Sequence, residues 1–138
     1  MPANTIPIYP ITPVTSVGQT IQTANTAKDG TGTVVTVFTA GANGASPTAM
    51  VFRATGTNTA TVARIFLNNG STNATASNNS LIGEVTLAAT TLSEVAALAD
   101  YRWSFPDGFK MPAGYKINIT IGTTVAATYA ITCYGGDY

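Results

Sequence analysis

The sequence predicts an all-β protein, an antiparallel β-sandwich of about eight strands connected as a jelly roll. Apolar and polar residues alternate with a period of two along several short segments, as they do in strands with one buried face. These segments recur at a spacing of about ten residues, and turns rich in Gly, Asn and Pro separate them. Thr is abundant, and this β-branched residue favours strands.

Chain length and composition restrict the fold and the partners. A chain of 138 residues forms about one domain with one core. Six Lys and Arg balance six Asp and Glu, and charged residues make up only 9% of the chain. A nucleic-acid binder needs a basic field, so no nucleic acid is expected as a partner. No apolar run approaches the ~20 residues of a membrane span, and no signal peptide is recognisable in residues 1–10, so no membrane partner is expected either.

The zero formal net charge also bears on association. A neutral surface has little electrostatic repulsion to keep copies of the protein apart. We therefore expect partners or further copies of the chain to cover much of the surface. The alternative is a soluble domain whose surface is hydrated through Thr and Asn.

Residues 1–14 are expected to form an extended N-terminal arm, followed by a β-sandwich domain at residues 15–138. Proline fixes φ and removes a backbone donor, so this segment cannot be a central strand; its prolines are Pro2, Pro7, Pro10 and Pro13. The arm is too apolar for a free tail, and we expect it to lie on its own domain or on a neighbour. The residues expected to bind a partner are Ile6, Pro7, Ile8, Tyr9, Pro10 and Ile11.

Four strands are expected in the first half of the sandwich, at residues 16–24, 33–40, 50–55 and 59–68. Residues 34–38 are apolar on both faces, which predicts a central strand. Arg53 and Arg64 are expected to face solvent or to pair with a carboxylate such as Glu84 across the sheet. A loop is expected at residues 41–47, and residues 69–80 are expected to be an exposed, mobile polar loop.

Four more strands are expected in the second half, at residues 81–90, 101–105, 115–121 and 127–134. The short Gly-Thr-Thr connection at residues 122–124 predicts that the last two form a hairpin. Residues 91–100 have helical spacing and fit either a short helix or an extended crossover. Trp103 is expected to anchor the core, and the single cysteine, Cys133, is expected to be buried without a disulfide.

Catalytic chemistry is not expected. The chain has no histidine, which removes the usual general base and the commonest metal ligand. Cys133 lacks a base partner. The candidate catalytic carboxylates each stand alone in the sequence; they are Glu84, Glu94, Asp100 and Asp107. We therefore expect no enzyme, no catalytic residues, no cofactor and no metal site.

Aromatic residues leave sugar binding as an alternative function. A sugar ring can stack on an exposed aromatic side chain, although core packing is the preferred interpretation of these residues. The candidates are Tyr101, Trp103, Tyr115, Tyr134 and Tyr138.

A set of strand and turn segments in residues 50–138 resembles a known group of proteins. The order is VARIFLNNG at 62–70, LIGEVTL at 81–87, an aromatic strand, MPAGY at 111–115 and GGDY at 135–138. This resembles small β-sandwich structural proteins of tailed bacteriophages, some of which are head decoration or cement proteins. The resemblance brings no catalytic residues with it.

The resemblance implies a structural virion protein that binds the outside of a phage head and stabilises the lattice. Its implied partner is the major capsid protein, and its implied assembly is a homotrimer. It would be made in the host cytoplasm and end on the capsid surface. A tail, fibre or baseplate module is the alternative, and a carbohydrate-binding module is a further one.

Overall fold

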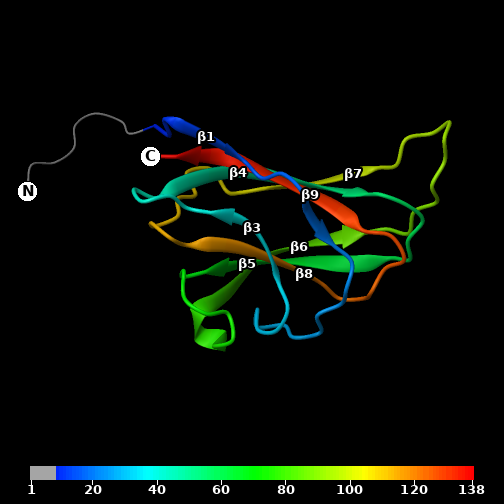
Figure 1. Cartoon of the computed structure of the whole chain (residues 1–138), viewed down its shortest axis with the longest axis horizontal. Coiled ribbons are helices and arrows are strands. Elements are labelled where there is room, and N and C mark those ends of the chain that lie inside the picture. Colours follow the sequence, from blue (N-terminus) through cyan, green and yellow to red (C-terminus); the bar gives the residue numbers. More distant parts are fainter. Residues whose placement is uncertain (1–8) are drawn as a thin grey trace, which may run out of the picture.

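Two antiparallel sheets pack face to face in the computed structural model, which describes residues 9–138 (Figure 1). The first sheet has the strand order β1-β9-β4-β7, and β2 also pairs with β9; the second has the order β3-β8-β5-β6. The strands are β1 Thr12–Thr15, β2 Gln19–Ile21, β3 Val35–Thr39, β4 Ala45–Ala54, β5 Thr61–Asn68, β6 Asn79–Leu87, β7 Asp100–Ser104, β8 Lys116–Ile121 and β9 Tyr129–Asp137. The predicted all-β sandwich is confirmed.

The connections between the strands are those of a jelly roll. Both β1 and β2 pair with β9, so together they act as one strand interrupted at residues 16–18. At the interruption, Ser16 makes two hydrogen bonds with the backbone of Cys133. Its N donates to the Cys133 O at 2.8 Å, and its Oγ accepts from the Cys133 N at 2.7 Å. Counted this way, each sheet has four strands, and except for β5 and β6 consecutive strands lie in opposite sheets.

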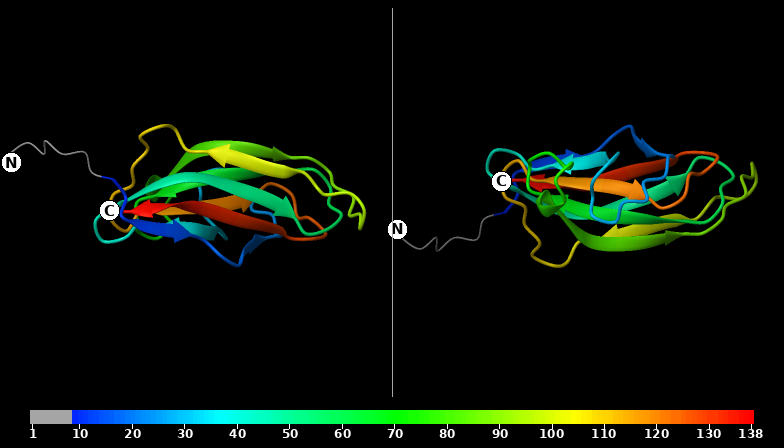
Figure 2. Two further views of the ribbon diagram at one scale, coloured as in Figure 1. Left: turned by 90° about the horizontal axis from the view of Figure 1, so that it is seen from above. Right: turned by 90° about the horizontal axis from the view of Figure 1, so that it is seen from below.

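The core lies between the two sheets, whose broad faces are seen from above and below in Figure 2. Alternation places Ile117, Ile119 and Ile121 of β8 inward, and all three are fully buried. Met50 and Phe52 of β4 face them from the first sheet, together with Tyr129, Ile131 and Cys133 of β9. The predicted burial of Cys133 is confirmed.

The predicted hairpin between the last two strands is wrong, because β8 and β9 belong to different sheets. Each already has neighbours on both sides: β8 lies between β3 and β5, and β9 lies between β4 and the β1/β2 pair. Residues 122–128 carry the chain from one sheet to the other. β9 also continues past residue 134, where we expected it to end, and reaches Asp137.

The predicted central position of residues 34–38 is also wrong, because β3 is an edge strand of the second sheet. Its pairing with β8 shifts between Thr36 and Phe38. At this irregularity Val37 and Phe38 are both buried, which accounts for the apolar character on both faces. The loop expected at residues 41–47 is shorter than predicted, since β4 begins at Ala45.

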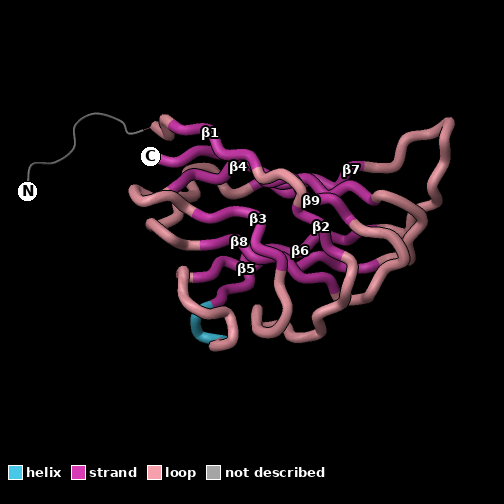
Figure 3. The backbone as a smooth tube through the Cα atoms, viewed as in Figure 1, coloured by secondary structure: helices cyan, strands magenta, loops and turns pink. Residues whose placement is uncertain are grey.

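The predicted polar loop and the segment left open between a helix and a crossover are both connections between strands. Apart from a 3-10 turn at Ala76–Asn78, the described residues form strands, turns and loops, as Figure 3 shows. Residues 91–99 are thus an extended crossover. Residues 69–78 are tied to a neighbouring loop, because the Asn73 Nδ2 donates to the O atoms of Gly30 and Gly32. Within residues 9–138, no helix is long and apolar enough to cross a membrane.

Both predicted arginine pairs can now be placed. The Arg64 Nε lies 2.9 Å from the Glu84 Oε1 across β5 and β6, as expected. Arg53 pairs instead with Asp100 of β7, at 2.8 Å.

Candidate interaction surface

The predicted partner-binding residues divide into two groups. Ile6, Pro7 and Ile8 lie outside the described residues. Tyr9, Pro10 and Ile11 are described, and they run beside the end of β9. The Ile11 N donates to the Asp137 O at 2.9 Å, and Pro10 covers Gly136, where a Cβ would lie 2.6 Å from the Pro10 Cβ. The side chains of Tyr9 and Ile11 remain 72% and 81% exposed.

The boundary that we expected between residues 14 and 15 falls inside β1, Thr12–Thr15. Residues 12–14 are therefore paired with β9 as part of the first sheet. Pro13 fits here because β1 is an edge strand, where a missing backbone donor is tolerated.

Residues 9–13 form one wall of a groove of about 500 Å³. Its floor comes from Ser46 and Thr48 of β4 and from Gly135 and Gly136 of β9. The groove is open above Gly135 and Gly136 because these residues have no side chains to fill it. The backbones of β4 and β9 also approach each other closely there. A Cβ on Gly135 would lie 2.5 Å from the Pro47 Cα, so β4 and β9 can pair at this point only with glycine.

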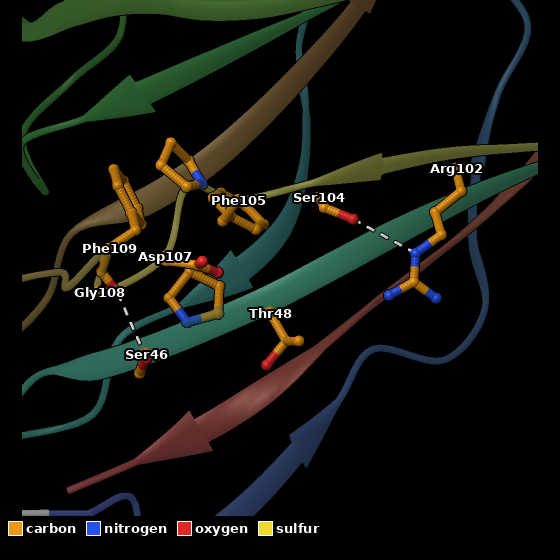
Figure 4. Close-up of a pocket in the computed structure, with 10 residues that line it drawn as sticks. Ser46, Thr48, Arg102, Ser104, Phe105, Asp107, Gly108 and Phe109 are labelled. Carbon is orange, nitrogen blue, oxygen red and sulfur yellow. Dashed lines mark hydrogen bonds between the residues drawn. The ribbon is translucent and has the colours of Figure 1, made fainter.

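A second hollow of about 340 Å³ lies on the other side of β4 (Figure 4). Arg102 and Ser104 of β7 and residues 105–109 line it, and Ser46 and Thr48 belong to both hollows. The Ser46 Oγ donates to the Phe109 O at 3.2 Å, which fixes the loop over the end of the sheet. We call the two hollows together the end groove.

The end groove is apolar beside residues 9–13 and polar beside β7. The Arg102 Nε donates to the Ser104 Oγ at 3.3 Å, and the guanidinium lies 5.7 Å from the centre of the Tyr134 ring. Among residues 9–138, the salt bridges within 4.0 Å are those of Arg53 and Arg64, so Arg102 has no carboxylate partner there. Asp107 lines the same hollow, so the β7 end of the groove carries one basic and one acidic side chain.

The five candidate sugar-binding rings do not form a shared exposed platform. Tyr101, Trp103 and Tyr115 pack against the core. Trp103 also meets Phe105 edge to face, with ring centres 4.8 Å apart. Tyr134 and Tyr138 are half-buried, with Arg102 and Lys110 at 5.7 Å from their respective ring centres.

Three of the candidate catalytic groups are either ion-paired or buried. Glu84 and Asp100 are held in ion pairs with arginines. Burial raises the pKa of the Cys133 thiol to about 12, so it is protonated near neutral pH. Within residues 9–138, no group of three or more His, Cys, Asp or Glu side chains is placed to hold a metal ion.

Sequence reasoning found one wall of the end groove and missed the rest. Ser46, Thr48, Gly135 and Gly136 meet only through the pairing of β4 with β9. The adjacent glycines in a strand were a local signal of close backbone approach, but they could not show which strand approaches. No protein-family model, curated protein sequence or solved structure matches the chain.

Proposed function

We propose that this chain is a structural virion protein of a tailed bacteriophage, which binds the outside of the head and stabilises its lattice. Its partner is the major capsid protein, and its assembled form is a trimer. The observation that carries the proposal is the exposed apolar wall of the end groove. Tyr9 and Ile11 stand 72% and 81% exposed on a backbone that β9 holds in place.

The surface chemistry supports this function. A protein that covers a capsid must sit beside many copies of itself, and like charges on neighbouring copies would repel one another. A chain with zero formal net charge and 9% charged residues avoids that repulsion. The jelly-roll sandwich supplies a rigid body, and its edge at β1 supplies an apolar surface for contact.

Copy number in purified virus particles tests the location. Quantitative mass spectrometry should give a ratio to the major capsid protein near one, or near a simple lattice fraction. A handful of copies per particle would assign the chain to a tail, fibre or baseplate instead. Absence from the particle would overturn the virion proposal altogether.

Binding to heads that lack the protein tests the surface. Deletion of residues 2–8, and separately Tyr9→Ser with Ile11→Ser, should weaken binding while leaving β1 and the sandwich folded. Leu81→Ser is the matched control, because Leu81 is 48% exposed on β6 of the other sheet. Equal binding by all the variants and the unchanged protein would remove residues 2–11 from the capsid contact.

A further inference from the structure

The hollow between β4 and the loop after β7, which we call the β7 hollow, gathers exposed polar side chains (Figure 4). Within residues 9–138, neither Arg102 nor Asp107 takes part in an ion pair. The Ser104 Oγ accepts from the Arg102 Nε, which leaves the hydroxyl hydrogen of Ser104 free to donate. Thr48 is exposed where β4 shifts its register against β9. The hollow therefore offers both donors and acceptors to a ligand.

The fold brings these groups together from two strands and a loop. Arg102 and Ser104 are two residues apart in β7, so they lie on the same outward face of the first sheet. The Phe105 N donates to the Thr48 O at 3.0 Å, which places Thr48 beside the end of β7. The loop that follows carries Asp107 to the same hollow.

An aromatic ring supplies the apolar part of the β7 hollow. Phe109 is half-buried, and its ring stacks on that of the buried Phe105, with the ring centres 5.2 Å apart. The hydrogen bond from the Ser46 Oγ holds the Phe109 backbone over β4. An apolar patch thus lies at a fixed place beside the hydroxyl and charged groups.

The mixed charge of the hollow restricts its ligand. A phosphate attracted by Arg102 would meet the carboxylate of Asp107, and a cation attracted by Asp107 would meet the guanidinium of Arg102. A single carboxylate also falls short of the clustered oxygen ligands that a calcium ion needs. The ligand that fits is uncharged, with closely spaced donors and acceptors and one apolar face. A sugar ring has these properties, because its hydroxyl groups donate and accept while its C–H bonds form an apolar face.

We propose that the β7 hollow binds a neutral sugar unit of a glycan. The Asp107 carboxylate accepts from neighbouring sugar hydroxyls, and the Arg102 guanidinium donates to sugar oxygens. The hydroxyls of Thr48 and Ser104 complete the polar contacts. Phe109 packs against the C–H face of the ring.

The size and position of the hollow agree with this ligand. Its volume of about 340 Å³ lies at the small end of the range of small-molecule sites, about 300–1,000 Å³, and suits a mono- or disaccharide. It opens on the other side of β4 from Tyr9 and Ile11. The sugar site therefore does not rest on the proposed capsid contact.

NMR titration of the purified, ¹⁵N-labelled full-length protein tests the site. The probes are glucose, galactose, mannose, N-acetylglucosamine, maltose and lactose, each added up to about 100 mM because a shallow site binds weakly. We expect at least one sugar to shift the amide signals of Ser104, Asp107 and Gly108 in a saturable way. Signals from residues 91–98, at the opposite end of the molecule in Figure 1, should stay unchanged. Glycine betaine and inorganic phosphate are titrated separately.

Three results of the titrations would overturn the proposal. The first is the absence of a saturable shift in the hollow with every one of these sugars. The second is a shift there with glycine betaine or phosphate but with no sugar, because the hollow then selects a charged ligand. The third is a set of sugar-dependent shifts confined to residues outside the hollow.

Substitutions test the roles of the charged side chains. Asp107→Ala and Arg102→Ala should each weaken binding of the responding sugar by about tenfold or more, because each removes charge-assisted hydrogen bonds. Glu94→Ala is the matched control, since it removes an exposed carboxylate at the opposite end of the molecule. Equal binding by all three variants and the unchanged protein would contradict the site. Absence from virus particles would overturn only the virion assignment, because the titration needs no particle.

Discussion

The indole ring of Trp103 in β7 lies against the backbone of Gly83 in β6, where a Cβ would stand 2.6 Å from the ring. β6 and β7 are edge strands of the two different sheets. Trp103 therefore closes one side of the sandwich, and Phe105 supports it edge to face. Trp103 was expected to anchor the core. It does so from the edge of the core, where it is half-buried.

Gly83→Ala should lower the free energy of unfolding by about 1–3 kcal/mol, because the new methyl group must displace the indole. Urea denaturation measures the change. In a Trp103→Ala background the same substitution should cost little, since the ring is gone. An equal cost in both backgrounds would contradict the contact as the cause.

The two arginine pairs should contribute unequally to stability. The Arg64 side chain is 13% exposed and that of Glu84 is 50% exposed, whereas Arg53 and Asp100 are both more than half exposed. Glu84→Gln should therefore cost up to about 1 kcal/mol, and Asp100→Asn less than about 0.5 kcal/mol. Thermal unfolding at low and high salt tests this order, and the opposite order would contradict it.

Asn25 organises the loop between β2 and β3. Its Nδ2 donates to the O atoms of Thr31 and Thr33 at 2.8 and 2.7 Å, and its Oδ1 accepts from the Ala27 N at 3.0 Å. Asn25→Asp should cost about 2–3 kcal/mol, because a buried carboxylate would then face two carbonyl oxygens. The control Asn43→Asp is exposed and should change stability by less than about 0.5 kcal/mol. Similar losses in the two variants would rule out this role for the Asn25 amide.

The Cys133 thiol should be unreactive toward a disulfide reagent at pH 8 in the folded protein and react fully in guanidinium chloride. Burial raises its pKa from the ordinary value of 9.0 to about 12, so folding favours the protonated form. This contribution to stability is complete below pH 9 and is lost as the pH rises toward 12. Cys133→Ala should lack this part of the alkaline loss. Fast labelling of the folded protein at pH 8 would show that the thiol is accessible.

Local patterns predicted the strands well, because alternation records which side chains face the core. The alternation at residues 115–121 predicts a strand with one apolar face, and Ile117, Ile119 and Ile121 on that face are fully buried. The polar face is buried too, at Asn118 and Thr120, because β8 is a central strand. Pairing between strands depends on distant segments, so the pattern could not show that β8 and β9 enter different sheets. Residues 122–124 are a plausible hairpin turn considered alone, but other strands occupy both sides of β8 and of β9.

The candidate surface was predictable only where it is continuous in the chain. The apolar character of Tyr9 and Ile11 is visible in the sequence. The groove beside them is formed by β4, β9 and β7, whose registers place Ala49 opposite both Ser104 and Tyr134. The free charge on Arg102 was equally hidden, since it depends on which carboxylates the folding brings near.

The pairing of Thr12 with Asp137 determines when the chain can fold during its synthesis on the ribosome. The first sheet cannot assemble until β9 has been synthesised, because β9 separates β1 from β4. A nascent chain that has reached only residue 128 has open backbone groups along β4 and uncovered Met50 and Phe52. Such incomplete chains are expected to need protection by chaperones or to be degraded. The sandwich should fold only after β9 has left the ribosome.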